Sequence, residues 1–125
     1  MSIEELKQRF KCFAINVAEL IQKLPFNNIN TPYCNQLVRS SSSSAANYRA
    51  ACRGKSTPDF INKLKIVEEE LDESVFFLEL LVHFNPGYKE KIDILMKEGN
   101  ELLAITVQSI LTSRHNQNQI KKINN

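Results

Sequence analysis

Histidine, cysteine and carboxylate side chains are the residues of this sequence that could bind a metal or catalyse a reaction. His83 and His115 have no companion at metal-ligand spacing, and the chain contains no HExxH motif. Cys34 and Cys52 are expected on the core face of one helix, where thiols are structural. The acidic run at residues 68–73 lies in a predicted helix, which distributes its carboxylates around the axis, and no His at matched spacing is visible. We therefore expect no metal site.

The sequence predicts neither nucleophilic catalysis nor nucleotide binding. The serine run at residues 40–44 has no nearby His to act as a general base. The chain has only three Gly, and they form no Gly-rich loop for the phosphates of a nucleotide. We predict that the protein is not an enzyme and uses no cofactor.

Basic residues near the middle of the chain are the candidates for binding. Arg49, Arg53, Lys55 and Lys63 follow one another closely and could neutralise phosphates, an effect that repetition in an oligomer would multiply. Structured RNA or an RNA–protein complex is then the first candidate partner. In the alternative interpretation these cations are a solvated helix end that favours the helix dipole, and the protein is an interaction adaptor without affinity for nucleic acid.

Length and composition place these residues in one small domain. The chain has 125 residues and a net charge of +2, and no apolar run is long enough to cross a membrane. The N-terminus lacks a signal-peptide pattern, and three cysteines without CxxC spacing predict reduced thiols, so we expect a soluble, cytoplasmic protein. Residues 1–65 contain ten Lys and Arg against four Asp and Glu, whereas residues 66–125 contain six against ten. This asymmetry fits a nucleic-acid partner or self-association.

Heptad-like spacing predicts four helices. The first carries apolar residues three and four positions apart, between a capping box at Ser2 and Glu5 and a stop at Pro25. Thr31 and Pro32 are expected to open the second helix, which includes the serine run and ends near residue 53. Its expected core face is Cys34, Leu37, Ser41, Ala45, Tyr48 and Cys52.

The same start signal recurs for the other two helices. Thr57 and Pro58 open the third, and Asn85 with Pro86 closes it and opens the fourth. Short connections between helices imply antiparallel neighbours. We predict an all-α, up-down-up-down four-helix bundle over residues 1–113, followed by a polar, flexible tail at residues 114–125.

Two helix faces are left over after the core is built. The second helix has a face of small and neutral polar residues with arginines, opposite its core face. The third helix has a second stripe, in which carboxylates interrupt large apolar residues that would be exposed on a monomer. Arg39 is expected to pair with Glu70 or Glu73, between helices or across an interface, rather than with phosphate. The predicted oligomer interface is Gln36, Arg39, Ser40, Asn47, Glu70, Glu73, Phe77, Leu80 and Phe84.

Residues 36–81 resemble a known family. The pairs Gln36-Leu37, Arg39-Ser40 and Phe60-Ile61, together with Asn47, Leu64 and the acidic-aromatic segment 70–79, are similar to a pattern of four-helix-bundle proteins. These proteins were first noted as reading frames in intervening sequences of bacterial 23S ribosomal RNA genes. They include, more distantly, the accessory variability determinants of diversity-generating retroelements. The resemblance implies a homo-oligomeric ring, commonly a pentamer, without known enzymatic activity, and its retroelement branch binds nucleic acid and a reverse transcriptase.

Overall fold

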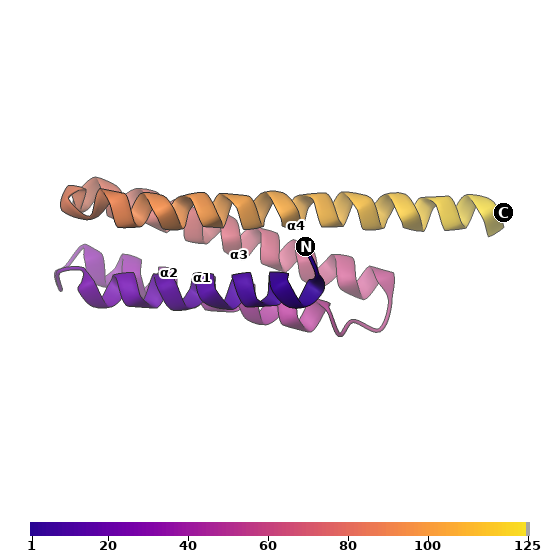
Figure 1. The fold of residues 1–125 in the computed structure, drawn as a ribbon, viewed down its shortest axis with the longest axis horizontal. Helices are drawn as coiled ribbons and strands as arrows, with labels where there is room; N and C mark the ends of the chain where they lie inside the picture. Colours follow the sequence, from indigo (N-terminus) through magenta and orange to yellow (C-terminus); the bar gives the residue numbers. More distant parts are fainter. Residues whose placement is uncertain (125) are drawn as a thin grey trace.

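The computed structural model describes residues 1–124, and the main elements are four α-helices (Figure 1). They are α1 (Ile3–Lys23), α2 (Asn30–Ala51), α3 (Thr57–Phe84) and α4 (Lys89–Asn124), with a short 3-10 helix η1 (Pro86–Tyr88) before α4. The described residues contain no strand. The predicted all-α, four-helix architecture is therefore confirmed.

Helix starts follow local capping chemistry. The Ser2 hydroxyl accepts a hydrogen bond from the backbone N–H of Glu5 at 3.1 Å, as the sequence predicted. The prediction of Thr31 as the N-cap of α2 is wrong, because the Asn27 side chain accepts hydrogen bonds from the backbone N–H groups of Ile29 and Asn30 and starts the helix earlier. The cap of α3 is Ser56, one residue before the predicted Thr57.

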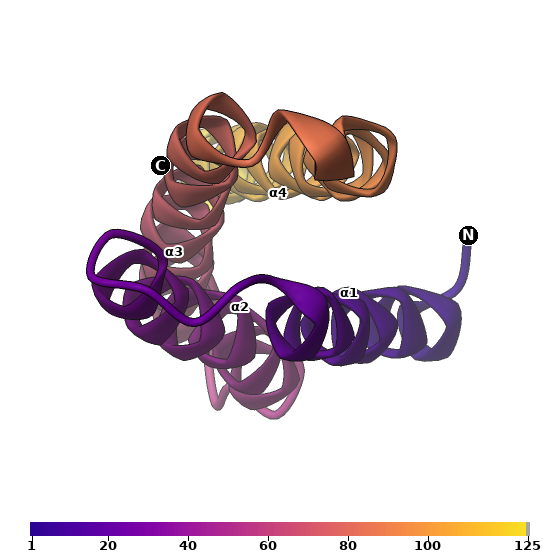
Figure 2. The ribbon, with the colours of Figure 1, turned by 90° about the vertical axis from the view of Figure 1, so that its left-hand side faces the viewer.

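Viewed end-on, the helices follow one another around the bundle in chain order (Figure 2). The most extensive packing is between α2 and α3 and between α3 and α4, while α1 packs less extensively on α4 than on α2. An ion pair joins α1 to α4, because the Arg9 guanidinium contacts Glu98 and also lies 3.0 Å from a Glu101 carboxylate oxygen. Gly99 is buried in α4, and a Cβ there would lie 3.0 Å from Val75 Cγ2 and 3.3 Å from Phe13 Cζ. Its lack of a side chain therefore lets α4 approach both α1 and α3.

Most residues of the predicted apolar stripes form the core. The rings of Phe10 and Tyr48 stack with their centroids 4.6 Å apart, which ties α1 to α2. The largest fully buried side chains include Phe10, Phe13, Leu37, Leu64, Leu71, Leu78, Leu81, Ile92 and Leu102. All four helices contribute to one hydrophobic core, whose buried residues run from Leu6 to Ile110.

The serine run of α2 is helical, as predicted, but it is packed differently from the expectation. Ser40 was expected on the face opposite the core, and it is fully buried instead. Its hydroxyl lies 2.8 Å from that of Ser74 on α3, and the Ser74 hydroxyl also donates to the carbonyl of Glu70. The Ser44 hydroxyl bonds the carbonyl of Ser41 within α2. Small side chains that satisfy their own hydroxyls let α2 and α3 pack closely, and this accounts for the burial of Ser40.

A buried pair of amides connects the two loops at one end of the bundle. Asn30 Nδ2 donates to Asn85 Oδ1 at 2.9 Å, and Asn85 Nδ2 donates to Asn30 Oδ1 at 2.8 Å. Asn30 Nδ2 also donates to the carbonyl of Pro25, and Asn85 Nδ2 to that of Leu81. The start of α2 is thus fixed to the end of α3.

The end of α4 differs from the sequence prediction. A flexible tail was expected from residue 114, but residues 114–124 continue the helix, and Asn125 lies outside the described residues. Asn, Gln and Lys are all accepted on an exposed helix, so their polarity did not exclude this conformation. Within residues 1–124, no helix is both long and apolar enough to cross a membrane.

Candidate interaction surface on α2 and α3

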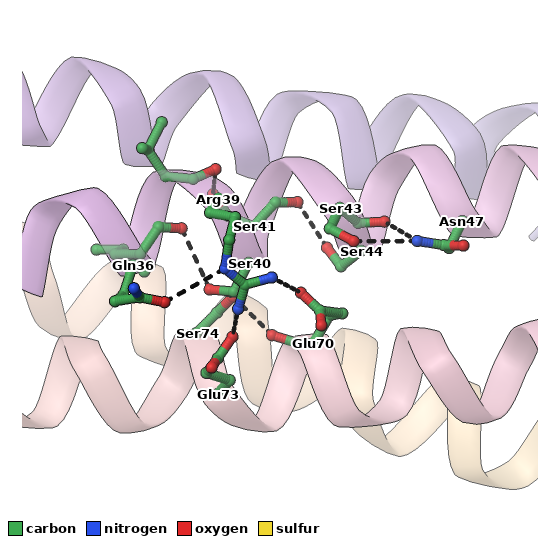
Figure 3. Close-up of polar contacts among 12 residues, drawn as sticks. Gln36, Arg39, Ser40, Ser41, Ser43, Ser44, Asn47, Glu70, Glu73 and Ser74 are labelled. Atoms are coloured by element: carbon green, nitrogen blue, oxygen red, sulfur yellow. Dashed lines mark hydrogen bonds and ion pairs between the residues drawn. The ribbon is translucent and has the colours of Figure 1, made fainter.

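An arginine of α2 and two glutamates of α3 form an ion-pair cluster at the surface (Figure 3). Arg39 Nη1 lies 3.0 Å from Glu70 Oε2, and Arg39 Nη2 contacts the Glu73 carboxylate. Arg39 Nε donates to Gln36 Oε1 at 3.3 Å. The carboxylates that interrupt the apolar stripe of α3 thus find their cation within the same chain. An assembled neighbour does not have to supply one.

The other polar residues of the predicted interface have different environments. Asn47 is half-buried, and its Nδ2 donates to both the carbonyl and the hydroxyl of Ser43 (Figure 3). Ser40 is buried beneath the cluster, so within the folded chain its side chain faces α3. Gln36 and Arg39 are exposed, with Glu70 and Glu73 half-buried beside them.

Aromatic side chains extend this surface toward the end of α3. Phe84 is 49% exposed and Phe76 is 51% exposed. Tyr33 of α2 lies against Phe77 and Phe84, with ring centroids 6.0 Å and 6.1 Å apart, and Phe76 meets Phe77 edge-on at 5.5 Å. We call these four residues the aromatic row. Two of its rings, those of Phe76 and Phe84, are about half exposed on the outer surface of the bundle.

Part of the aromatic row was not foreseen. Phe77, Leu80 and Phe84 were predicted as exposed, but Phe77 and Leu80 are half-buried. Tyr33 covers Phe77, and it was missed because it precedes the periodic part of α2. Phe76 was missed because it lies outside the three-four spacing of the stripe, although two adjacent phenylalanines on a helix already imply that their side chains point to different sides.

The predicted basic residues gather where α2 ends and α3 begins. Arg49 is in the last turns of α2, Arg53 and Lys55 lie in the connecting loop, and Lys63 is in the second turn of α3. All four are exposed. None of them forms an ion pair with a carboxylate in the part of the chain that the structure describes.

The three thiols have distinct environments and are all free. Cys12 is exposed, Cys52 is half-buried and Cys34 is buried, and burial raises the pKa of the Cys34 thiol. Burial, and secondly the neighbouring Cys52, raise the pKa of the Tyr48 phenol. Across residues 1–124, His, Cys, Asp and Glu side chains form no group of three that could hold a metal ion.

The fold and its surface define an all-α four-helix bundle whose α2–α3 side combines an ion-pair cluster with an aromatic row. Sequence comparison then identifies the family: the chain belongs to the 23S rRNA-intervening sequence protein family, whose model matches residues 4–108. The resemblance seen in residues 36–81 is thereby confirmed.

A solved structure supports the same relationship. The chain is 28% identical to a protein from Bacteroides thetaiotaomicron described as having unknown function and belonging to the S23 ribosomal protein family. The two structures superpose with a TM-score of 0.73, covering 84% of this chain and 97% of the other. A search of curated proteins found no match. Neither the family description nor that of the solved structure names an enzymatic activity.

Proposed function

We propose that this chain is a non-enzymatic scaffold that assembles into a homo-oligomeric ring, a pentamer, through the surface of α2 and α3, and that the assembly binds structured RNA. The observation that carries the proposal is the aromatic row. Phe76, beside Phe77, and Phe84, beside Tyr33, are each about half exposed, and exposed aromatic side chains of this size are costly on a monomer and typical of protein interfaces. The pentamer itself rests on the family resemblance.

The ion-pair cluster supports the same surface. Arg39 is 48% exposed, and such an exposed pair contributes only about 0–1 kcal/mol to the stability of a chain. Within one chain, Arg39 already balances one of the two carboxylate charges of the cluster. A neighbour that covers the cluster therefore meets a single excess negative charge. The cost of removing these charges from water is therefore lower than for an unpaired carboxylate.

Assembly is tested by sedimentation velocity at tens of micromolar protein. The native chain should sediment as an oligomer, and Phe84→Lys should shift it toward the monomer because it places a charge in the aromatic row. Ile94→Lys is the matched control, because Ile94 on α4 is 69% exposed and lies away from this row. A native chain that sediments as a monomer would exclude the ring.

The RNA part of the proposal is carried by the four exposed basic residues Arg49, Arg53, Lys55 and Lys63. A ring repeats this cluster in every subunit and so raises the local density of positive charge. Affinity for a structured RNA should fall steeply with salt concentration, because bound cations release counterions from the phosphates. If no RNA binds even at low salt, the aromatic row still favours the second candidate, an oligomeric protein-interaction adaptor.

A further inference from the structure

A groove between α1 and α2 gathers cations from both helices. Its volume is about 470 Å³, and it lies on the flank of α2 that faces α1 rather than α3. Lys7, Lys11 and Arg49 are the three cations of its lining. The complete lining is Glu4, Lys7, Gln8, Lys11, Ala45, Ala46 and Arg49.

The charge of this groove is positive. Glu4 is its one carboxylate and lies 3.0 Å from Lys7 Nζ, but its side chain is 79% exposed. Such a surface pair is weak and readily exchanged for a stronger anionic partner. Lys11 and Arg49 are exposed and form no ion pair within residues 1–124.

The shape of the groove suits a chain of phosphates. Lys7 and Lys11 both line the groove and are about one helical turn apart, so they lie on the same side of α1. The α2 wall consists of Ala45 and Ala46, whose small side chains allow close approach. Because the lining contains no aromatic residue, bases cannot stack there as they do on proteins that hold single strands.

We infer that the α1–α2 groove binds the phosphate backbone of double-helical RNA without reading its sequence. This inference rests on the proposed RNA binding and locates it more closely. Arg49 belongs both to this groove and to the predicted basic cluster, so the groove extends that cluster from α2 onto α1. Lys7 and Lys11 become RNA-contacting residues that the sequence analysis did not single out.

The experiment measures the affinity of the full chain for a fluorescent RNA hairpin by anisotropy, from about 50 to 200 mM salt. The test variant is Lys7→Gln with Lys11→Gln, and the control is Lys89→Gln with Lys91→Gln, which removes the same charge from the start of α4, at the other end of the bundle (Figure 1). Gln keeps the helical propensity of Lys. We expect the test variant to bind roughly tenfold more weakly and its salt dependence to lose about two phosphate contacts, with the control close to the native chain. Circular dichroism and sedimentation should show that fold and assembly are unchanged.

Two outcomes would overturn the inference. If the test variant and the control bind RNA equally, while Arg53→Gln with Lys55→Gln loses affinity, the groove assignment fails and the proposed RNA binding stands. If the native chain binds no RNA at about 50 mM salt, both fail.

Discussion

Removing the side chain of Asn30 should destabilise the protein strongly, because this residue is one half of the buried amide pair. Asn30 is 2% exposed and Asn85 is 6% exposed, so water cannot readily replace the lost partner. Asn30→Ala leaves Asn85 Oδ1 without its donor and removes the hydrogen bond to the carbonyl of Pro25. Asn85 Nδ2 loses its bond to Asn30 Oδ1 but keeps its bond to the carbonyl of Leu81.

The magnitude follows from these groups. A buried polar atom without a partner costs about 1–3 kcal/mol, and each lost hydrogen bond contributes about 1 kcal/mol more. Alanine returns a few tenths of a kcal/mol through its higher helix propensity. We therefore expect Asn30→Ala to lower the free energy of unfolding by about 3–5 kcal/mol.

Urea unfolding followed by circular dichroism measures this change, at fixed protein concentration because assembly would stabilise the folded chain. Asn35→Ala is the matched control on the exposed face of α2. The double variant Asn30→Ala with Asn85→Ala should cost clearly less than the sum of the two single variants, with a coupling of about 1–3 kcal/mol. Equal stabilities for Asn30→Ala and Asn35→Ala, or additive single variants, would refute the role of the pair.

Three further predictions concern packing, pH and thiol reactivity. Gly99→Leu should lower the free energy of unfolding in urea by at least about 1–3 kcal/mol, because a Cβ would already meet Val75 and Phe13, whereas Gly87→Leu in open space should change little. Raising the pH above about 10 should lower the free energy of unfolding, because the unfolded chain releases the Tyr48 proton at a lower pH than the folded chain does. Urea unfolding at pH 7 and pH 10.5 should show a smaller loss of stability with pH for Tyr48→Phe than for the native chain. Alkylation of the native chain followed by mass spectrometry should modify Cys12 quickly and Cys34 only on unfolding, and equal rates would contradict the burial of Cys34.

Much of the fold could be predicted from the sequence because the relevant signals are local. The apolar spacing of α1 and the cap at Ser2 are read within a few residues of one another, and both are confirmed. The error at Thr31 has a local cause, whereas the error at Ser40 depends on a contact with another helix. A side chain outside the helix, Asn27, made the better cap, and a serine was classed as polar although its hydroxyl is satisfied by Ser74.

The candidate surface was predicted less completely. Pairing of Arg39 with Glu70 and Glu73 was expected, but whether it occurs within one chain or between two depends on how closely α2 and α3 pack. The cover that Tyr33 provides for Phe77 likewise requires the relative rotation of these two helices. The periodicity of a single helix specifies neither the separation of two helices nor their relative rotation.

By itself the sequence determined the number of helices, most of their ends and most of the core, since capping and the 3.6-residue period act between neighbours along the chain. Only the tertiary structure decided which distant residues meet. Asn30 and Asn85 are 55 positions apart, and Lys11 shares a groove with Arg49 because α1 packs on α2 in one register. Such contacts depend on the choice of helix neighbours and on their rotation, which the whole core sets at once when it packs.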